Sequence, residues 1–215
     1  MKKLLFVLIL VSLVFAQNPG AYIGTLKLEN ASTVSMQCQE IFMDCNANST
    51  DQTVAAESLN VAPPITCTLS AQPDVPRNIS ITVTDGNVSI SAFDIDVLGI
   101  NAEGAAKIEN FLFAGGLVQV GNIAFATITS VTVNSITGAD AGDVLDVGVG
   151  SKLGISNNIL LTGDVYKVKI GSADYALADY TTSVTYNTVD VSTGGALGAY
   201  SEVTIWYKIT LNVVY

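Results

Sequence analysis

The chain has 215 residues, of which 49% are hydrophobic and only 13% charged, and it contains no histidine. The absence of histidine excludes a Ser-His-Asp triad and a Cys-His nucleophile, and the three unevenly spaced cysteines fit no zinc pattern. Nineteen acidic residues against nine basic ones exclude nucleic acid as an expected partner, because phosphate contacts need clustered Lys and Arg.

The first residues have the pattern of a secretory signal peptide. Lys2 and Lys3 form a short basic region, residues 4–15 form an apolar run, and a small-residue cleavage pattern ends at Ala16. The run is shorter than the roughly 20 apolar residues that span a bilayer. We therefore expect cleavage before Gln17, no membrane insertion afterwards, and a secreted protein, either extracellular or at the cell surface.

The mature chain, residues 17–215, is predicted to be a single all-β domain. Val, Ile, Thr, Ser, Ala and Gly abound, and the 199 residues suffice for one sandwich with its own core. Seven basic and nineteen acidic residues remain, a net charge of −12, which favours solubility and disfavours binding to an anionic membrane. Low charge with high β-propensity is also typical of proteins that associate through strand edges.

Two strands are predicted near the new N-terminus, at residues 22–28 and 34–43, and residues 17–45 are a candidate N-terminal arm. The elements expected next are a polar turn, a short strand and a stiff proline-rich connector, at residues 46–52, 60–70 and 72–76.

Residues 77–97 are predicted to form a hairpin. Apolar and hydroxylated side chains alternate through residues 77–84, and Asp-Gly-Asn at residues 85–87 supplies the residues that tight turns prefer. The alternation resumes after the turn and changes frame at Ala92 and Phe93. One extra residue, a β-bulge, is the simplest cause of such a change.

The following segment contains one ambiguous stretch and one long strand. Residues 105–113 suit either a helix or a strand edge, and residues 122–134 are predicted to be a long strand. Residues 138–151 are rich in Gly and Asp and are expected to form a loop. Alternation returns at residues 166–170, before a turn at residues 171–174.

The last predicted strand, residues 202–215, has the most regular alternation in the chain. Apolar side chains fall on one face from Val203 to Tyr215, and only Trp206 is a large side chain on the other face. Such a strand is well beyond the usual five or six residues. It is expected to be either a central strand of the fold or one that reaches into a neighbouring subunit.

Three segments resemble a known kind of domain: Pro-Asp-Val-Pro-Arg-Asn-Ile at 73–79, Ala-Phe-Ala-Thr-Ile-Thr-Ser-Val-Thr-Val at 124–133, and Gly-Asp-Val-Leu-Asp-Val-Gly-Val-Gly-Ser-Lys-Leu-Gly-Ile at 142–155. In order and spacing, residues 73–155 are similar to a β-domain of tailed-bacteriophage virion structural proteins, of the decoration or fibre kind. The resemblance implies a β-domain with a structural role. A phage structural protein normally lacks an export signal, so a cellular protein that uses a virion-like domain at the cell surface fits both observations.

The predicted fold is an antiparallel β-sandwich, jelly-roll or immunoglobulin-like, with a terminal strand that is a candidate for exchange between subunits. Turn signals every 8 to 15 residues between β-rich runs favour this architecture.

Acidic residues supply the candidate metal ligands. Asp140, Asp143 and Asp146 recur every three residues in the Gly- and Asp-rich loop, and oxygen ligands from such a loop suit Ca²⁺, although a solvated turn explains them as well. Asp94 and Asp96 share one strand face, where solvation is the default. A glycosidase needs two carboxyl groups at a defined separation, and nothing in the sequence places a second acid at that distance. We expect no enzyme activity and no cofactor other than calcium.

The other candidate sites concern covalent modification and sugar binding. Cys38, Cys45 and Cys67 allow one disulfide in an exported protein, with the pairing open and one thiol left over. Four Asn-X-Ser/Thr sequons are candidates for glycosylation: Asn30, Asn48, Asn78 and Asn87. Trp206 is a candidate for stacking on a sugar ring, or for packing under a loop or a neighbouring subunit.

The function expected from the sequence is that of a secreted structural subunit. Export, the virion-like segments and low-charge strands together predict self-assembly into a filament, tube or surface layer, in which terminal strands complete neighbouring sheets. Residues 17–28 and the C-terminal strand are the candidate donors. The alternative is a cell-surface adhesin or carbohydrate-binding module.

Overall fold

The computed structural model describes residues 35–194, 197 and 201–211. In this part of the chain all strands pair antiparallel, and the only helical elements are two 3₁₀ turns, η1 (Thr162–Asp164) and η2 (Ser192–Gly194). The all-β antiparallel class expected from the sequence is confirmed. The signal peptide, the arm before residue 35 and the last four residues of the C-terminal strand lie outside the described residues.

A large, curled sheet contains nine strands in the order β11-β12-β8-β4-β7-β5-β6, with β2 beside β8 and β3 beside β7. Their bounds are β2 (Ser49–Ser58), β3 (Ile65–Thr66), β4 (Arg77–Thr84), β5 (Ala92–Asn101), β6 (Ala106–Leu112), β7 (Val118–Thr137), β8 (Val144–Gly154), β11 (Thr181–Ser183) and β12 (Thr188–Asp190). The longest strand, β7, lies at its middle and pairs with β4 and β3 on one side and with β5 on the other.

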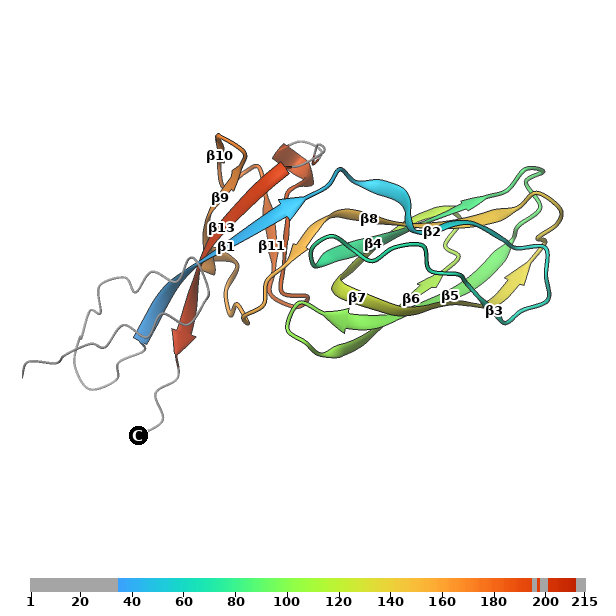
Figure 1. Cartoon of the computed structure of the whole chain (residues 1–215), viewed down its shortest axis with the longest axis horizontal. Coiled ribbons are helices and arrows are strands. Elements are labelled where there is room, and N and C mark those ends of the chain that lie inside the picture. The colour runs from blue at the N-terminus through green and yellow to red at the C-terminus, as the bar shows by residue number, and fades with distance from the viewer. Residues whose placement is uncertain (1–34, 195–196, 198–200, 212–215) are drawn as a thin grey trace, which may run out of the picture.

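A small sheet lies at one end of the elongated molecule (Figure 1). Its order is β1-β13-β9-β10, with bounds β1 (Ser35–Cys45), β13 (Ser201–Leu211), β9 (Val165–Ile170) and β10 (Ala173–Tyr175). The C-terminal strand β13 is therefore a central strand of this sheet, with β1 on one side and β9 on the other. Its alternation places Val203, Ile205 and Tyr207 in the interior, as expected.

The two sheets enclose two separate apolar cores. The large core lies inside the curl of the large sheet and includes Ile81, Ile95 and Val133. The small core includes Val168 and Ile205 of the small sheet, but Leu153, Ile155, Val189 and Val191 come from strands β8 and β12 and the residues that follow them. Strand β8 contributes to both cores, because Leu145, Val147 and Val149 belong to the large one. One continuous strand thus links the two interiors.

The hairpin predicted at residues 77–97 is wrong in its pairing, although both strands exist. Strand β7 lies between β4 and β5, so the two do not pair with each other. The Asp-Gly-Asn turn residues form a wider loop, in which the Asp85 carboxylate accepts hydrogen bonds from the backbone N–H groups of Asn87, Ser89 and Ile90 at 3.4, 3.1 and 2.9 Å. The change of frame falls in this loop, before β5 begins, so no bulge is needed at Ala92.

The loop predicted at residues 138–151 is also wrong over most of its length, because β8 begins at Val144. Glycine lowers strand propensity, but here a side chain has no room. A Cβ atom on Gly148 would lie 1.8 Å from the Ser49 carbonyl oxygen, and one on Gly150 would meet the Asn78 side chain at 2.6 Å. The glycines therefore allow β2 and Asn78 to pack closely on β8. Residues 105–113 take the strand alternative, as β6.

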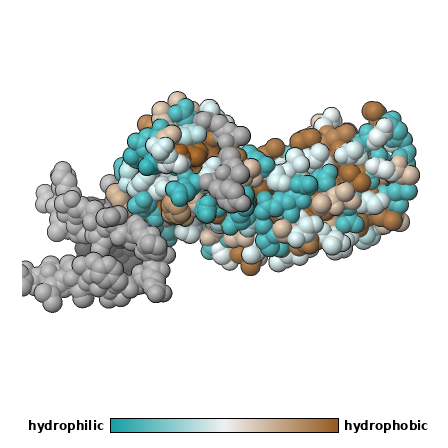
Figure 2. Space-filling model, turned by 45° about the horizontal axis from the view of Figure 1, so that its top comes forward, coloured by the Kyte–Doolittle hydropathy of each residue, from teal (hydrophilic) through white to brown (hydrophobic). Residues whose placement is uncertain are grey.

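The surface view shows apolar side chains in several separate groups along the body (Figure 2). In the part of the chain that the structure describes, no helix is long and apolar enough to cross a membrane.

Candidate functional site

The most distinctive feature of the described surface is the outer edge of β1. This eleven-residue strand pairs with β13 along its whole length, and β13 is the neighbour that the described residues provide. On the other side, every second residue of an edge strand leaves its N–H and C=O groups unpaired. In the described part of the chain the other edge strands are shorter: β10 and β11 have three residues each, β6 has seven, and β2, which pairs only with β8, has ten. β1 is thus the longest edge strand among the described residues.

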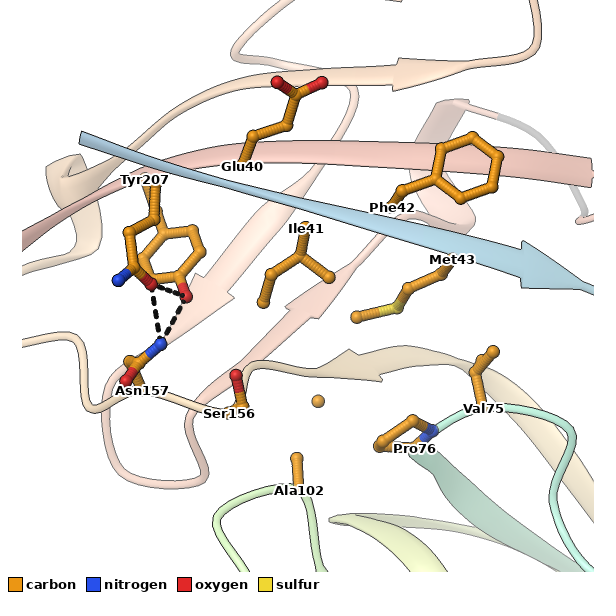
Figure 3. Close-up of a pocket in the computed structure, with 12 residues that line it drawn as sticks. Glu40, Ile41, Phe42, Met43, Val75, Pro76, Ala102, Ser156, Asn157 and Tyr207 are labelled. Atoms are coloured by element: carbon orange, nitrogen blue, oxygen red, sulfur yellow. Dashed lines mark hydrogen bonds between the residues drawn. The ribbon is translucent and has the colours of Figure 1, made fainter. Parts of the chain in front are cut away.

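A groove of about 500 Å³, lined by both apolar and polar residues, runs along the inner face of β1, between this strand and the end of the large sheet. Ile41 and Met43 point into it from β1, and Val75, Pro76 and Ser156 lie opposite (Figure 3). Glu40 and Phe42 point away from it, as the alternation of a strand requires. We call this cavity, together with the free edge of residues 39–43, the β1 groove.

A hydrogen-bonded triangle closes one end of the β1 groove (Figure 3). The Asn157 amide donates to the Gln39 side-chain oxygen at 2.7 Å and to the Tyr207 hydroxyl at 2.8 Å, and that hydroxyl donates to the same Gln39 oxygen at 2.7 Å. Burial raises the pKa of Tyr207, although its hydrogen bonds with Asn157 and Ser156 act in the opposite direction. The triangle joins β1, β13 and the β8–β9 connection, so it fixes the width of the groove at this end.

The opposite wall is fixed by close backbone packing. The Gly154 N–H donates to the Pro76 carbonyl at 2.9 Å, and a Cβ on Gly154 would meet Ala102, Ala124 and Pro76 within 3.1 Å. The connector at residues 72–76, predicted from its prolines, therefore lies against the end of β8. Because this contact leaves no space for a side chain, the wall is rigid.

Arg77 locks the junction between the two sheets. Its side chain is 0% exposed; Nε donates to the Gly150 carbonyl at 2.7 Å and Nη1 to the Asn46 carbonyl at 2.9 Å. Nη1 also lies 3.4 Å from the Asp74 carboxylate, and Nη2 donates to the Asn48 side-chain oxygen. One planar fork thus holds the β1–β2 connection, the connector and β8 together.

The groove offers main-chain hydrogen bonds and apolar contacts rather than reactive groups. Glu40, which points away, and Tyr207 are the ionisable side chains among its lining residues. A strand edge without a second neighbour, beside a groove that can receive alternate side chains, is the arrangement that accepts an extended peptide as an added strand. Sequence reasoning predicted β1 but not the groove, because its walls come from distant parts of the chain: residues 39–43, 75–76, 102, 154, 156–157 and 207.

The three predicted calcium ligands do not converge. Both oxygens of the buried Asp143 accept backbone N–H groups, from Gly86 at 3.0 Å and Asp140 at 2.9 Å, while Asp146 accepts the Ala56 N–H at 2.7 Å. Among the described residues no three His, Cys, Asp or Glu side chains are grouped so as to hold a metal ion. The carboxylates of Asp143 and Asp146 instead hold neighbouring backbone segments through hydrogen bonds. Calcium binding stays a prediction.

Asp94 and Asp96 share the outer face of β5, as expected, and both lie beside the side-chain amides of Asn110 and Asn134. The Asn110 side-chain amide donates to both carboxylates, at 2.6 and 2.7 Å, and Asn134 donates to Asp96 at 2.8 Å. The two amides offset the like charges of the neighbouring carboxylates.

The expected disulfide is not formed in this structure: Cys38, Cys45 and Cys67 are free thiols. Cys38 and Cys45 lie in one extended strand, seven residues and about 23 Å apart, which is far beyond disulfide reach. Cys45 is buried in the small core and Cys67 in the large one. Desolvation by burial raises the pKa of each of these two thiols to about 12. They behave as small apolar side chains.

Of the four sequons, Asn78 is buried in the folded protein, and its glycosylation stays a prediction. Its side chain is 0% exposed; the amide nitrogen donates to the Gly121 carbonyl at 3.1 Å and its oxygen accepts the Lys152 N–H at 2.8 Å. Asn48 and Asn87 are exposed, although Asn48 accepts from Arg77 and Asn87 donates to Asp140. Asn30 lies outside the described residues.

Trp206 lies on the outer face of the small sheet and is half-buried. The Lys167 Nζ lies 5.1 Å from the centroid of its ring, a cation–π contact. A sugar stacked on that face of the ring would have to displace this ammonium group.

Comparison of the chain with protein-family models, with curated proteins and with solved structures finds no match.

Proposed function

We propose that this chain is an exported structural subunit that self-assembles into an extracellular filament, tube or surface layer through β-strand complementation. The observation that carries the proposal is the eleven-residue edge of β1 with a groove beside it, into which Ile41 and Met43 point. Natural proteins usually blunt such an edge with lysine, proline or a covering segment, because it is a template for pairing with another chain. Residues 35–45 contain neither lysine nor proline.

The composition supports the same role. A net charge of −12 on the mature chain keeps the subunit soluble. Only 13% of the residues of the whole chain are charged, so the electrostatic repulsion between strand edges of two copies is small. Of the other edges, those of β6, β10 and β11 are shorter, and the ten-residue β2 pairs with β8 in an interrupted register, so β1 offers the longest regularly paired edge of the described residues. The virion-like character of residues 73–155 is part of this proposal: the segment forms most of the large sheet, as a rigid body of a subunit.

A sandwich arrangement is supported in the small core, to which both sheets contribute. We propose that a strand added at β1 extends the small sheet and covers the open side of this core. The jelly-roll or immunoglobulin-like order remains part of the proposal. The described part of β13 is already paired on both sides, so it is a central strand here and the N-terminal arm is the remaining candidate donor.

Negative-stain electron microscopy of the exported protein, with and without Ca²⁺, tests the proposal. We expect filaments, tubes or sheets at micromolar concentration in both conditions. Dispersed single subunits in both would contradict self-assembly. In that case retention on carbohydrate resins, compared between the native chain and Trp206→Ala, would test the adhesin alternative.

A further inference from the structure

The β1 groove has the dimensions of a short strand segment. Its β1 side spans Gln39 to Met43, four steps of about 3.3 Å, which is enough for a strand that inserts two side chains two residues apart. The inward neighbours Ile41 and Met43 are apolar, and Val75 and Pro76 opposite them are apolar too. An inserted pair of side chains must therefore be apolar, with one residue between them that faces outward.

We propose that the occupant of the β1 groove is the segment at residues 17–28 of a second copy of this chain, added as a strand beside β1, with Leu26 and Leu28 in the groove. The inference rests on the proposed function and names the joint that it requires. In this segment Tyr22, Leu26 and Leu28 share one parity, whereas Thr25 and Lys27 have the other. The two leucines have the two-residue spacing that the groove requires.

Charge complementarity supports this register. When Leu26 and Leu28 face inward beside Ile41 and Met43, Lys27 between them faces outward. That face of β1 carries Glu40 and the exposed Asp44. Opposite charges on neighbouring strands stabilise their pairing. The single lysine of the segment thus meets the acidic face of the edge strand.

The direction of β1 favours a second copy over the chain's own arm. β1 begins at the end of the small sheet that lies away from the large sheet and runs toward it (Figure 1). The chain therefore enters β1 at Ser35, while the groove begins four residues, or about 13 Å, further on. A segment that enters there must reverse to reach its own groove, but it extends directly to that of a neighbour.

Two complementary variants test the joint in the full exported chain. Ser156→Trp fills the groove from its far wall and leaves the arm intact; Asn158→Trp, two residues along the same loop, lies outside the groove lining and is its control. Leu26→Asp damages the arm and leaves the groove intact; Thr25→Asp, of the opposite parity, is its control. Circular dichroism verifies folding, and Ala102→Phe fills the groove from another residue should Ser156→Trp misfold.

We expect each of Ser156→Trp and Leu26→Asp alone to stay monomeric in analytical ultracentrifugation at ten times the concentration at which both controls assemble. An equimolar mixture should form one-to-one dimers and nothing larger, since one intact arm meets one intact groove. Assembly of both variants like the native chain would overturn this joint and leave the proposed function standing. Monomers in the mixture would overturn exchange between copies and favour an arm bound to its own chain. A native chain that never assembles overturns the proposed function itself.

Discussion

The large and small sheets use the same kind of strand but differ in how their edges end. In the large sheet the longest strand, β7, is central, and of its two outermost strands β11 has three residues and β6 has seven. In the small sheet a long strand, β1, is itself outermost among the described residues, and a groove runs along its inner face. Among the described residues, the small sheet therefore ends in a long, regularly paired edge strand, whereas the large sheet does not.

The two ends are nevertheless held together as one structure. Strand β8 supplies Leu145 to the large core and Leu153 to the small one, and Arg77 binds the connecting segments on each side of it. A difference between the ends is therefore best measured by perturbing the junction, then each core, then the surface.

The largest expected effect is that of Arg77→Met. The change removes four hydrogen-bonded partners at once and leaves the largely buried Asp74 carboxylate without its cationic partner, although the Asn46 N–H still donates to it, so we expect a loss of about 3–5 kcal/mol in the free energy of unfolding. Chemical denaturation followed by circular dichroism measures it. Arg77→Lys keeps the charge without the planar fork and should lose less. An unchanged midpoint for Arg77→Met would show that the junction does not depend on this side chain.

Next in size are cavity variants, one in each core. Ile81→Ala in the large core and Ile205→Ala in the small core should each cost about 2–5 kcal/mol, since both side chains are fully buried. Trp206, the sole tryptophan, lies in the small sheet, so its fluorescence reports on that end, whereas circular dichroism reports on both. If the ends unfold separately, Ile205→Ala shifts the fluorescence transition more than Ile81→Ala does. Coincident transitions in every variant would show a single cooperative unit.

A smaller loss of stability is expected at alkaline pH, with similar contributions from the buried thiol in each core. Burial raises the pKa of Cys45 and Cys67 from 9.0 to about 12, so the folded chain keeps both thiols neutral while the unfolded chain ionises from about pH 9. The stability that the neutral thiols contribute is therefore fully present below pH 9 and is lost as pH rises towards 12. Denaturation midpoints measured from pH 8 to 11 give the slope. Cys45→Ala and Cys67→Ala should each make it shallower; a slope that neither change alters would contradict the burial of these thiols.

The smallest expected effect is that of Lys167→Met, on the outer face of the small sheet. This side chain forms an ion pair with Asp174 at 3.2 Å and lies over the Trp206 ring, but it is 43% exposed. Exposed pairs contribute about 0–1 kcal/mol, so the denaturation midpoint should hardly move while the Trp206 emission changes. A loss as large as that of Ile205→Ala would mean that this face is covered in solution.

The strands of this protein were predictable where alternation was long. The patterns at residues 34–43, 122–134, 166–170 and 202–215 gave β1, β7, β9 and β13, because period-2 alternation is a local property that survives any choice of neighbour. β8 was missed because its glycines resemble a loop, and only the close approach of Ser49 and Asn78 explains them. β2 was missed because the polar Ser49–Gln52 begins it.

By itself, the sequence determined that the protein is all-β and antiparallel, and it located the regular strands. The tertiary structure decided which strands pair, since β7 lies between β4 and β5, and which polar side chains are buried, since Arg77 and Asn78 are 0% exposed. It also decided that β1 is an edge strand within the described part of the chain and that a groove lies beside it. The physical reason is that alternation depends on neighbours in the chain, whereas pairing, burial and free edges depend on residues far apart in it.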